Sequence, residues 1–126
     1  MKAFIDGALG SRGAALLEPY SDDSHNCGLI LIEKDEFEDL AEQCNQNNFQ
    51  LCTHAIGDKG NQFVLDTYNN ALDDTSSRWR IEHAQMVHND DIDKFLPHQI
   101  IPSMQPSHCT SDMPWLEDRL GDDRID

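Results

Sequence analysis

FQLCTHAIGDKGNQFVLDTYNNALDDTSSRWRIEHA, residues 49–84, contains a complete strand–helix–strand unit. Residues 49–54 and 79–84 are short segments bounded by turn residues, which is typical of buried strands. Between them, after the break at Gly57-Asp58, apolar residues recur at the three- and four-residue spacing of an amphipathic helix. A helix that connects two neighbouring strands in this way makes them parallel. The sequence therefore predicts a parallel sheet covered by helices.

The same alternation continues on both sides of this unit. A strand is predicted at residues 1–5, a long irregular loop at 7–28, and a helix with an acidic outer face at 34–47. On the other side, Asn89 is predicted to cap a short helix, and residues 99–104 form an apolar strand candidate followed by a loop. The 126 residues therefore predict one structural unit of the α/β class.

The composition limits the kinds of partner. Against 24 acidic residues there are 9 basic ones, and the formal charge of -15 repels nucleic acid phosphates and anionic membrane surfaces. No apolar run approaches the roughly 20 residues of a membrane span. The four cysteines form no C-x-x-C pair, which favours free thiols over a structural zinc or redox site. We therefore expect an acidic, cytoplasmic protein without nucleic acid or membrane partners.

Two histidines, His54 and His83, each end a predicted strand, one strand–helix unit apart. Neighbouring parallel strands end at the same edge of a sheet, about 4.8 Å apart, which suits two ligands on one metal ion. A lone histidine at a strand end is more often a structural residue, but a pair at matching positions favours a metal site. A third ligand is still needed, and spacing does not choose among His88, His98 and His108.

Four motifs, in chain order, closely resemble amidohydrolase family 3. They are KAFIDGALGSRGA at 2–14, THAIGD at 53–58, RIEHAQ at 80–85, and SMQPSH with SDMPW within 103–115. The resemblance covers nearly the whole chain and implies a metal-dependent amidohydrolase with a TIM-type (β/α)8 barrel. A complete barrel needs about 250 residues. We therefore expect the chain to be an internal fragment, from about strand four to strand seven.

The resemblance also implies a metal site. The family's metal-binding histidines fall on His54 and His83, and the expected cofactor is one or two divalent ions, with zinc the first choice. The lysine before the F-x-D-G turn falls on Lys2, which in similar enzymes can be carboxylated and bridge two metals. The alternative is an exposed lysine with no such role. The His-x-His pair, the last-strand aspartate and the usual general base have no counterpart here, so no catalytic residue is assigned.

Four residues are expected to contact a small-molecule substrate: Arg12, Gln105, His108 and Trp115. The alternatives are a solvated loop charge for Arg12 and packing under the loop for Trp115. The implied reaction is hydrolysis of amide or other non-peptide C–N bonds by metal-activated water, although we expect the isolated 126 residues to lack normal activity. The competing hypothesis is a truncated, non-catalytic metal-binding or interaction module. In either case, exposed sheet edges predict a homo-oligomer or a complementing chain.

Overall fold

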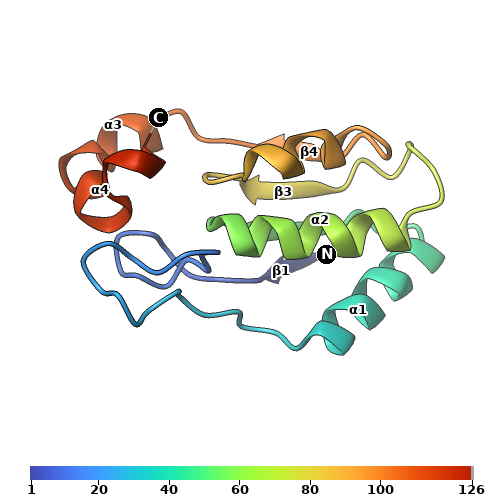
Figure 1. Cartoon of the computed structure of the whole chain (residues 1–126). Helices are drawn as coiled ribbons and strands as arrows, with labels where there is room; N and C mark the ends of the chain where they lie inside the picture. Colours follow the sequence, from blue (N-terminus) through green and yellow to red (C-terminus); the bar gives the residue numbers. More distant parts are fainter. Residues whose placement is uncertain (126) are drawn as a thin grey trace.

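A single parallel sheet of four strands organises the chain (Figure 1). The computed structural model describes residues 1–125. The strands are β1 (Lys2–Phe4), β2 (Cys52–Ala55), β3 (Arg80–His83) and β4 (Ile101–Ser103), and they lie in the order of the sequence. Each neighbouring pair is parallel, so all four strands end at the same edge. The predicted α/β class and parallel sheet are confirmed.

Helices cover one face of this sheet. The two long ones are α1 (Lys34–Gln46) and α2 (Asp58–Ala71), and α2 crosses between β2 and β3 as the sequence predicts. The next connection is η1 (Asn89–Phe95), a 3-10 helix. The prediction that Asn89 caps it is wrong, because the ring of His88 accepts the backbone N–H of Asp90 at 3.3 Å. Histidine is therefore the cap, one residue earlier than predicted.

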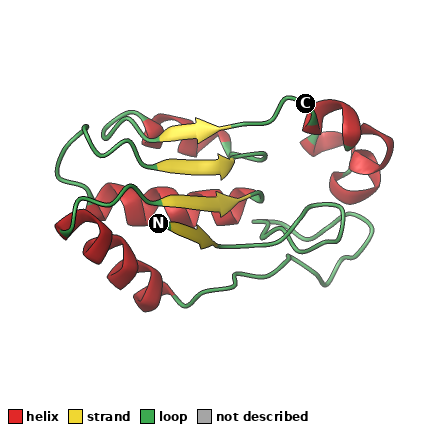
Figure 2. Ribbon diagram, turned by 180° about the vertical axis from the view of Figure 1, so that it is seen from behind, coloured by secondary structure: helices red, strands yellow, loops and turns green. Residues whose placement is uncertain are grey.

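The segment after β4 also differs from the prediction of a loop. It contains α3 (His108–Ser111), α4 (Met113–Leu120) and the short 3-10 helix η2 (Asp122–Arg124). Proline at 114 does not prevent α4, because it lies in the first turn, where its missing N–H has no helical partner. These helices lie beyond the carboxyl ends of the strands, beside the loop that follows β1 (Figure 2).

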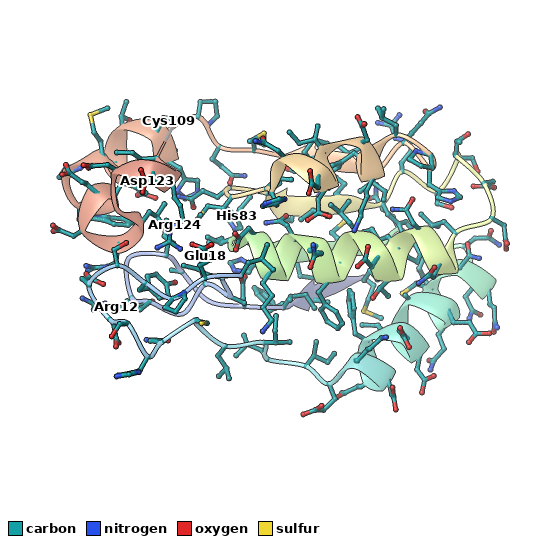
Figure 3. All side chains as sticks on the ribbon, in the orientation of Figure 1. Arg12, Glu18, His83, Cys109, Asp123 and Arg124 are labelled. Atoms are coloured by element: carbon teal, nitrogen blue, oxygen red, sulfur yellow. The ribbon has the colours of Figure 1, made fainter. Side chains whose placement is uncertain are left out.

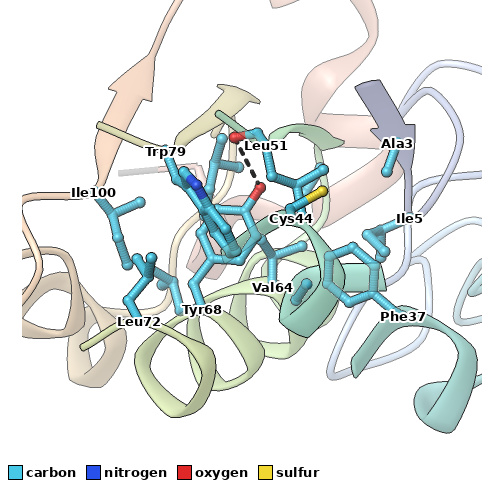
Figure 4. Packing of buried hydrophobic residues seen from close by; sticks show 14 of the residues in the cluster. Ala3, Ile5, Phe37, Cys44, Leu51, Val64, Tyr68, Leu72, Trp79 and Ile100 are labelled. Atoms are coloured by element: carbon cyan, nitrogen blue, oxygen red, sulfur yellow. Dashed lines mark hydrogen bonds between the residues drawn. The ribbon is translucent and has the colours of Figure 1, made fainter. Parts of the chain in front are cut away.

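The main core lies between the sheet and the long helices (Figure 4). Its centre is Trp79, which is 1% exposed and meets Tyr68 edge-on at 4.7 Å between ring centroids. The hydroxyl of Tyr68 lies 2.7 Å from Thr53 Oγ1 and 3.3 Å from the carbonyl oxygen of Leu51, the contact drawn in Figure 4. The buried hydroxyl of Tyr68 thus has partners on β2 and on the segment before it, and these contacts join the sheet to α2.

The opposite face of the sheet is open. None of the helices described for residues 1–125 covers it, and Figure 2 views the strands from this side. In the segment predicted as the first strand, Met1 and Phe4 are apolar but 61% and 56% exposed, so the strand is not buried on both faces. Only Ala3 of β1 points into the core. Side chains alternate between the two faces of a strand, so every second residue of this sheet lies on the open face.

Gly57, which precedes α2, supports a first prediction about stability. A Cβ at this position would lie 1.9 Å from the backbone oxygen of Ala15, too close for any side chain. We expect Gly57→Ala to lower the free energy of unfolding by about 1–3 kcal/mol or more, because backbone must move. Urea denaturation measures this. In the control, Gly10→Ala, the new methyl group would meet the side chain of Trp115 at 3.3 Å. Equal costs for the two variants would contradict the prediction.

Candidate metal centre

The rings of His54 and His83 lie together at the carboxyl edge of the sheet. Their centroids are 4.7 Å apart and their planes meet at 72°. His54 is on β2, and His83 is the last residue of β3, one position further along in register. The structure thus brings together the two histidines that the sequence selects as ligands.

His83 adopts a backbone conformation that is unusual for its residue type. Its φ is +77°, and the next residue, Ala84, has a φ of +43°. A left-handed conformation in a residue other than glycine costs of order 1–3 kcal/mol and is concentrated at functional sites. The left-handed backbone of His83 occurs at the residue whose ring lies beside that of His54. This strain is a second sign, independent of the sequence motif, that the position is functional.

Gln105 fixes the orientation of the His83 ring. Its amide nitrogen donates to the carbonyl oxygen of Ser103 at 2.9 Å, so its amide oxygen faces His83 Nδ1, 2.6 Å away. An oxygen at this distance requires the proton on Nδ1, which leaves a lone pair on Nε2. Burial lowers the pKa of His83; the hydrogen bond with Gln105 opposes this shift, and the nearby charges of His54, His108 and Lys2 add to it, so the net direction is downward. His83 is therefore neutral at pH 7, the form in which imidazole binds metals.

His54 has a different neighbour. Its Nε2 is buried and makes no aligned hydrogen bond, and it lies 3.4 Å from Oδ1 of Asp6. Sequence reasoning treated Asp6 only as part of the turn that closes the first strand. The signal that was available is an acidic residue directly after an apolar strand, inside the F-x-D-G motif.

Lys2 and His108 flank the pair. Lys2 lies in register with Cys52, two residues before His54 on the neighbouring strand, and its Nζ is 5.3 Å from the centroid of the Phe4 ring. The ring of His108 is 5.6 Å from that of His83, and its Nδ1 is 3.4 Å from a carboxylate oxygen of Asp112. His108 therefore brings a third imidazole close to the same edge.

The donor set fits part of a metal site. Within residues 1–125, no group of three or more His, Cys, Asp or Glu side chains is arranged to hold an ion. Two imidazoles at this separation fit two positions of a tetrahedral or larger coordination shell. Metal-binding histidines usually have a polar partner for their other ring nitrogen, often a carboxylate, and Asp6 Oδ1 lies 3.4 Å from the buried Nε2 of His54.

Two of the predicted substrate contacts have other partners here. The guanidinium of Arg12 makes two hydrogen bonds to Asp22, at 2.9 and 2.8 Å, and this ion pair lowers the pKa of Asp22. Figure 3 shows Arg12 at the far side of its loop, well separated from His83. Trp115 packs against Gly10 and is partly buried in a second apolar cluster below the loop. Both residues therefore hold the loop after β1 in place.

A cavity of about 680 Å³ lies beside His108. It lies between the loop after β1 and the terminal helices, where Figure 3 labels Glu18, Asp123 and Arg124. His108 lines this cavity and also contacts His83, so it connects the cavity with the edge of the sheet. The cavity walls combine apolar side chains with several carboxylates.

Comparison with known proteins assigns the chain. The model of the amidohydrolase family matches residues 1–126, its full length. The chain belongs to this family. Among curated relatives, it is 36% identical to Protein LONG AFTER FAR-RED 3 of Arabidopsis thaliana and 35% identical to Putative amidohydrolase YtcJ of Bacillus subtilis (strain 168). The matches cover 98% and 99% of this chain but only 22% and 24% of those relatives.

Solved structures agree with this amidohydrolase assignment. An uncharacterized metal-dependent hydrolase from Pyrococcus furiosus superposes with a TM-score of 0.87, and one from Pyrococcus horikoshii with 0.86. Both are 35% identical to the chain, which covers 25% of each. The predicted fold, a partial TIM-type barrel, is confirmed. In a closed barrel the open face of this sheet is the interior, which explains why described helices cover only the other face. No helix in residues 1–125 is long and apolar enough to cross a membrane.

Proposed function

We propose that this amidohydrolase chain supplies the two-histidine part of the metal centre of a hydrolase for amide or other non-peptide C–N bonds. The observation that carries the proposal is the pair of imidazoles, His54 and His83, 4.7 Å apart at the carboxyl edge of a parallel sheet. Active sites of TIM-type barrels lie at this edge. In this proposal residues 1–126 are one unit of the catalytic barrel, and the substrate is a small molecule.

The proposed cofactor is a divalent ion, zinc first. When bound, it would polarise the scissile carbonyl and lower the pKa of a bound water to about 7. His83 would offer Nε2, because Gln105 occupies Nδ1. Carboxylation of Lys2 would supply a further oxygen ligand and would favour two ions over one. The position of Lys2 on the open face, beside the strand that carries His54, supports this part of the proposal.

For substrate binding, we favour His108, because it lines the cavity and contacts His83. The remaining expected residues, Arg12, Gln105 and Trp115, contact Asp22, His83 and Gly10 instead. Their role in substrate binding stays a prediction.

The test is a chimera in which these 126 residues replace the matching quarter of the Bacillus subtilis relative. We expect the chimera to bind zinc and to release amine from at least one member of a panel of small amides. A chelator should stop the reaction and added zinc should restore it. The same chimera with His83→Ala is the control. A folded chimera that binds no more zinc than this control would refute the proposal.

The competing function, an interaction module, has one observation in its favour. Large apolar side chains are exposed around the β4 edge, including Ile92 at 53%, Leu96 at 69% and Met104 at 60%. An uncovered edge strand beside apolar surface favours association with a second copy or a complementing chain. Light scattering of the purified chain distinguishes the cases, because a stable monomer at micromolar concentration would oppose association.

The proposed compartment is the cytoplasm. All four cysteines, Cys27, Cys44, Cys52 and Cys109, are free thiols. Free thiols are typical of a reducing compartment and support this proposal.

A further inference from the structure

We propose that Asp6 is a positioning residue that holds the His54 ring with its proton on Nε2, so that Nδ1 is the nitrogen available to a metal. This inference rests on the proposed function for the metal, but its structural part can be tested without one. Carboxylates that accept the second N–H of a metal-binding histidine fix its tautomer and its orientation.

The carboxylate of Asp6 is completely buried and accepts three backbone hydrogen bonds. Oδ2 accepts the backbone N–H groups of Ala15 at 2.9 Å and Gly57 at 2.8 Å, and Oδ1 accepts that of Ile56 at 3.0 Å. These donors come from two loops, one after β1 and one after β2. A Cβ at Gly60 would lie 2.7 Å from Oδ2, so the wall behind the carboxylate leaves no space for it to move. Asp6 is therefore held at a fixed position.

The fourth neighbour of this carboxylate is His54. Its Nε2 is buried and lies 3.4 Å from Oδ1, without an aligned hydrogen bond. A neutral imidazole nitrogen that faces a carboxylate is more stable with a proton than with a lone pair, because two acceptors repel. The lone pair must then be on Nδ1. His83 has the reverse arrangement, with its proton on Nδ1.

The three backbone N–H groups alone would justify burying Asp6 as a loop staple, so the test must separate the two roles. Asp6→Asn does so. Two backbone N–H groups point at Oδ2 and only one at Oδ1. The amide oxygen of asparagine should therefore replace Oδ2, because an NH2 group is repelled less at the position of Oδ1. The NH2 group then faces His54 and, as a donor, moves the ring proton from Nε2 to Nδ1.

The first measurement is the tautomer of His54 in the metal-free chain, read by NMR from histidine labelled with nitrogen isotope. We expect the Nε2–H form with a slowly exchanging ring proton in the natural chain, and a shift toward Nδ1–H in Asp6→Asn. A natural chain with the proton on Nδ1 would overturn the proposal, even if the variant did not fold. A folded variant with an unchanged tautomer would overturn it as well.

The second measurement is zinc affinity, by competition with a coloured indicator. We expect Asp6→Asn to weaken binding by about 10- to 100-fold in the natural background and to have no further effect in the His54→Ala background. Equal losses in both backgrounds would show that Asp6 acts only through the loops. If His54→Ala itself leaves zinc affinity unchanged, the proposed metal centre fails, while the tautomer still decides the role of Asp6.

Discussion

Replacing His54 and His83 together by alanine should abolish zinc binding by the chain. The two rings lie 4.7 Å apart at the carboxyl edge, and residues 1–125 hold no alternative group of three ligands. Each single variant should lose most of the affinity, because the remaining imidazole cannot hold an ion by itself. Equilibrium dialysis with elemental analysis measures the bound zinc, and circular dichroism checks the fold.

The matched control for this prediction is His98→Ala. His98 precedes β4, at the other end of the sheet, and its Nδ1 lies 3.1 Å from the carbonyl oxygen of Asp74. This variant should bind zinc as the natural chain does. Stoichiometric zinc in the double variant, or an equal loss in the control, would exclude the assignment of His54 and His83 as ligands.

Trp79→Ala should cost the chain about 3–5 kcal/mol of unfolding free energy, the range for removing a large buried aromatic side chain. Trp79 is 1% exposed, meets Tyr68 at 4.7 Å, and donates from Nε1 to the carbonyl oxygen of Phe49 at 3.0 Å. The substitution removes the contact and the hydrogen bond and leaves a cavity beneath β3. Urea denaturation followed by circular dichroism measures the change in midpoint.

Two control variants distinguish the cost of the cavity at Trp79 from the cost of losing any tryptophan side chain. Trp79→Phe should cost less than Trp79→Ala, because it refills most of the space and loses mainly the hydrogen bond. Trp115→Ala should also cost less, since Trp115 is only partly buried, in the smaller cluster. A Trp79→Ala variant within about 1 kcal/mol of the natural chain would mean that this core tolerates the loss by collapsing.

The order of strands and helices was readable because it depends on local patterns. Residues 58–71 have apolar side chains at helical spacing, and 49–54 and 79–84 are short strand-like segments. Their apolar side chains are buried together only when the helix packs on the two strands. The predictions failed where a local pattern was weak. The residues after β4 combine two prolines and polar residues, and their helices bury only a few side chains, such as Leu120, against the loop after β1.

The sequence by itself determined the parallel sheet and placed His54 and His83 near the ends of neighbouring strands, because strand direction follows from the alternation of elements. Only the tertiary structure decided which atoms surround the two rings. Asp6 accepts backbone N–H groups from residues 56 and 57, about fifty positions away in the chain. Gln105, which follows β4, lies against the ring of His83 on the preceding strand. Such contacts depend on how separate loops meet after the core has formed, and no local preference of the residues specifies them.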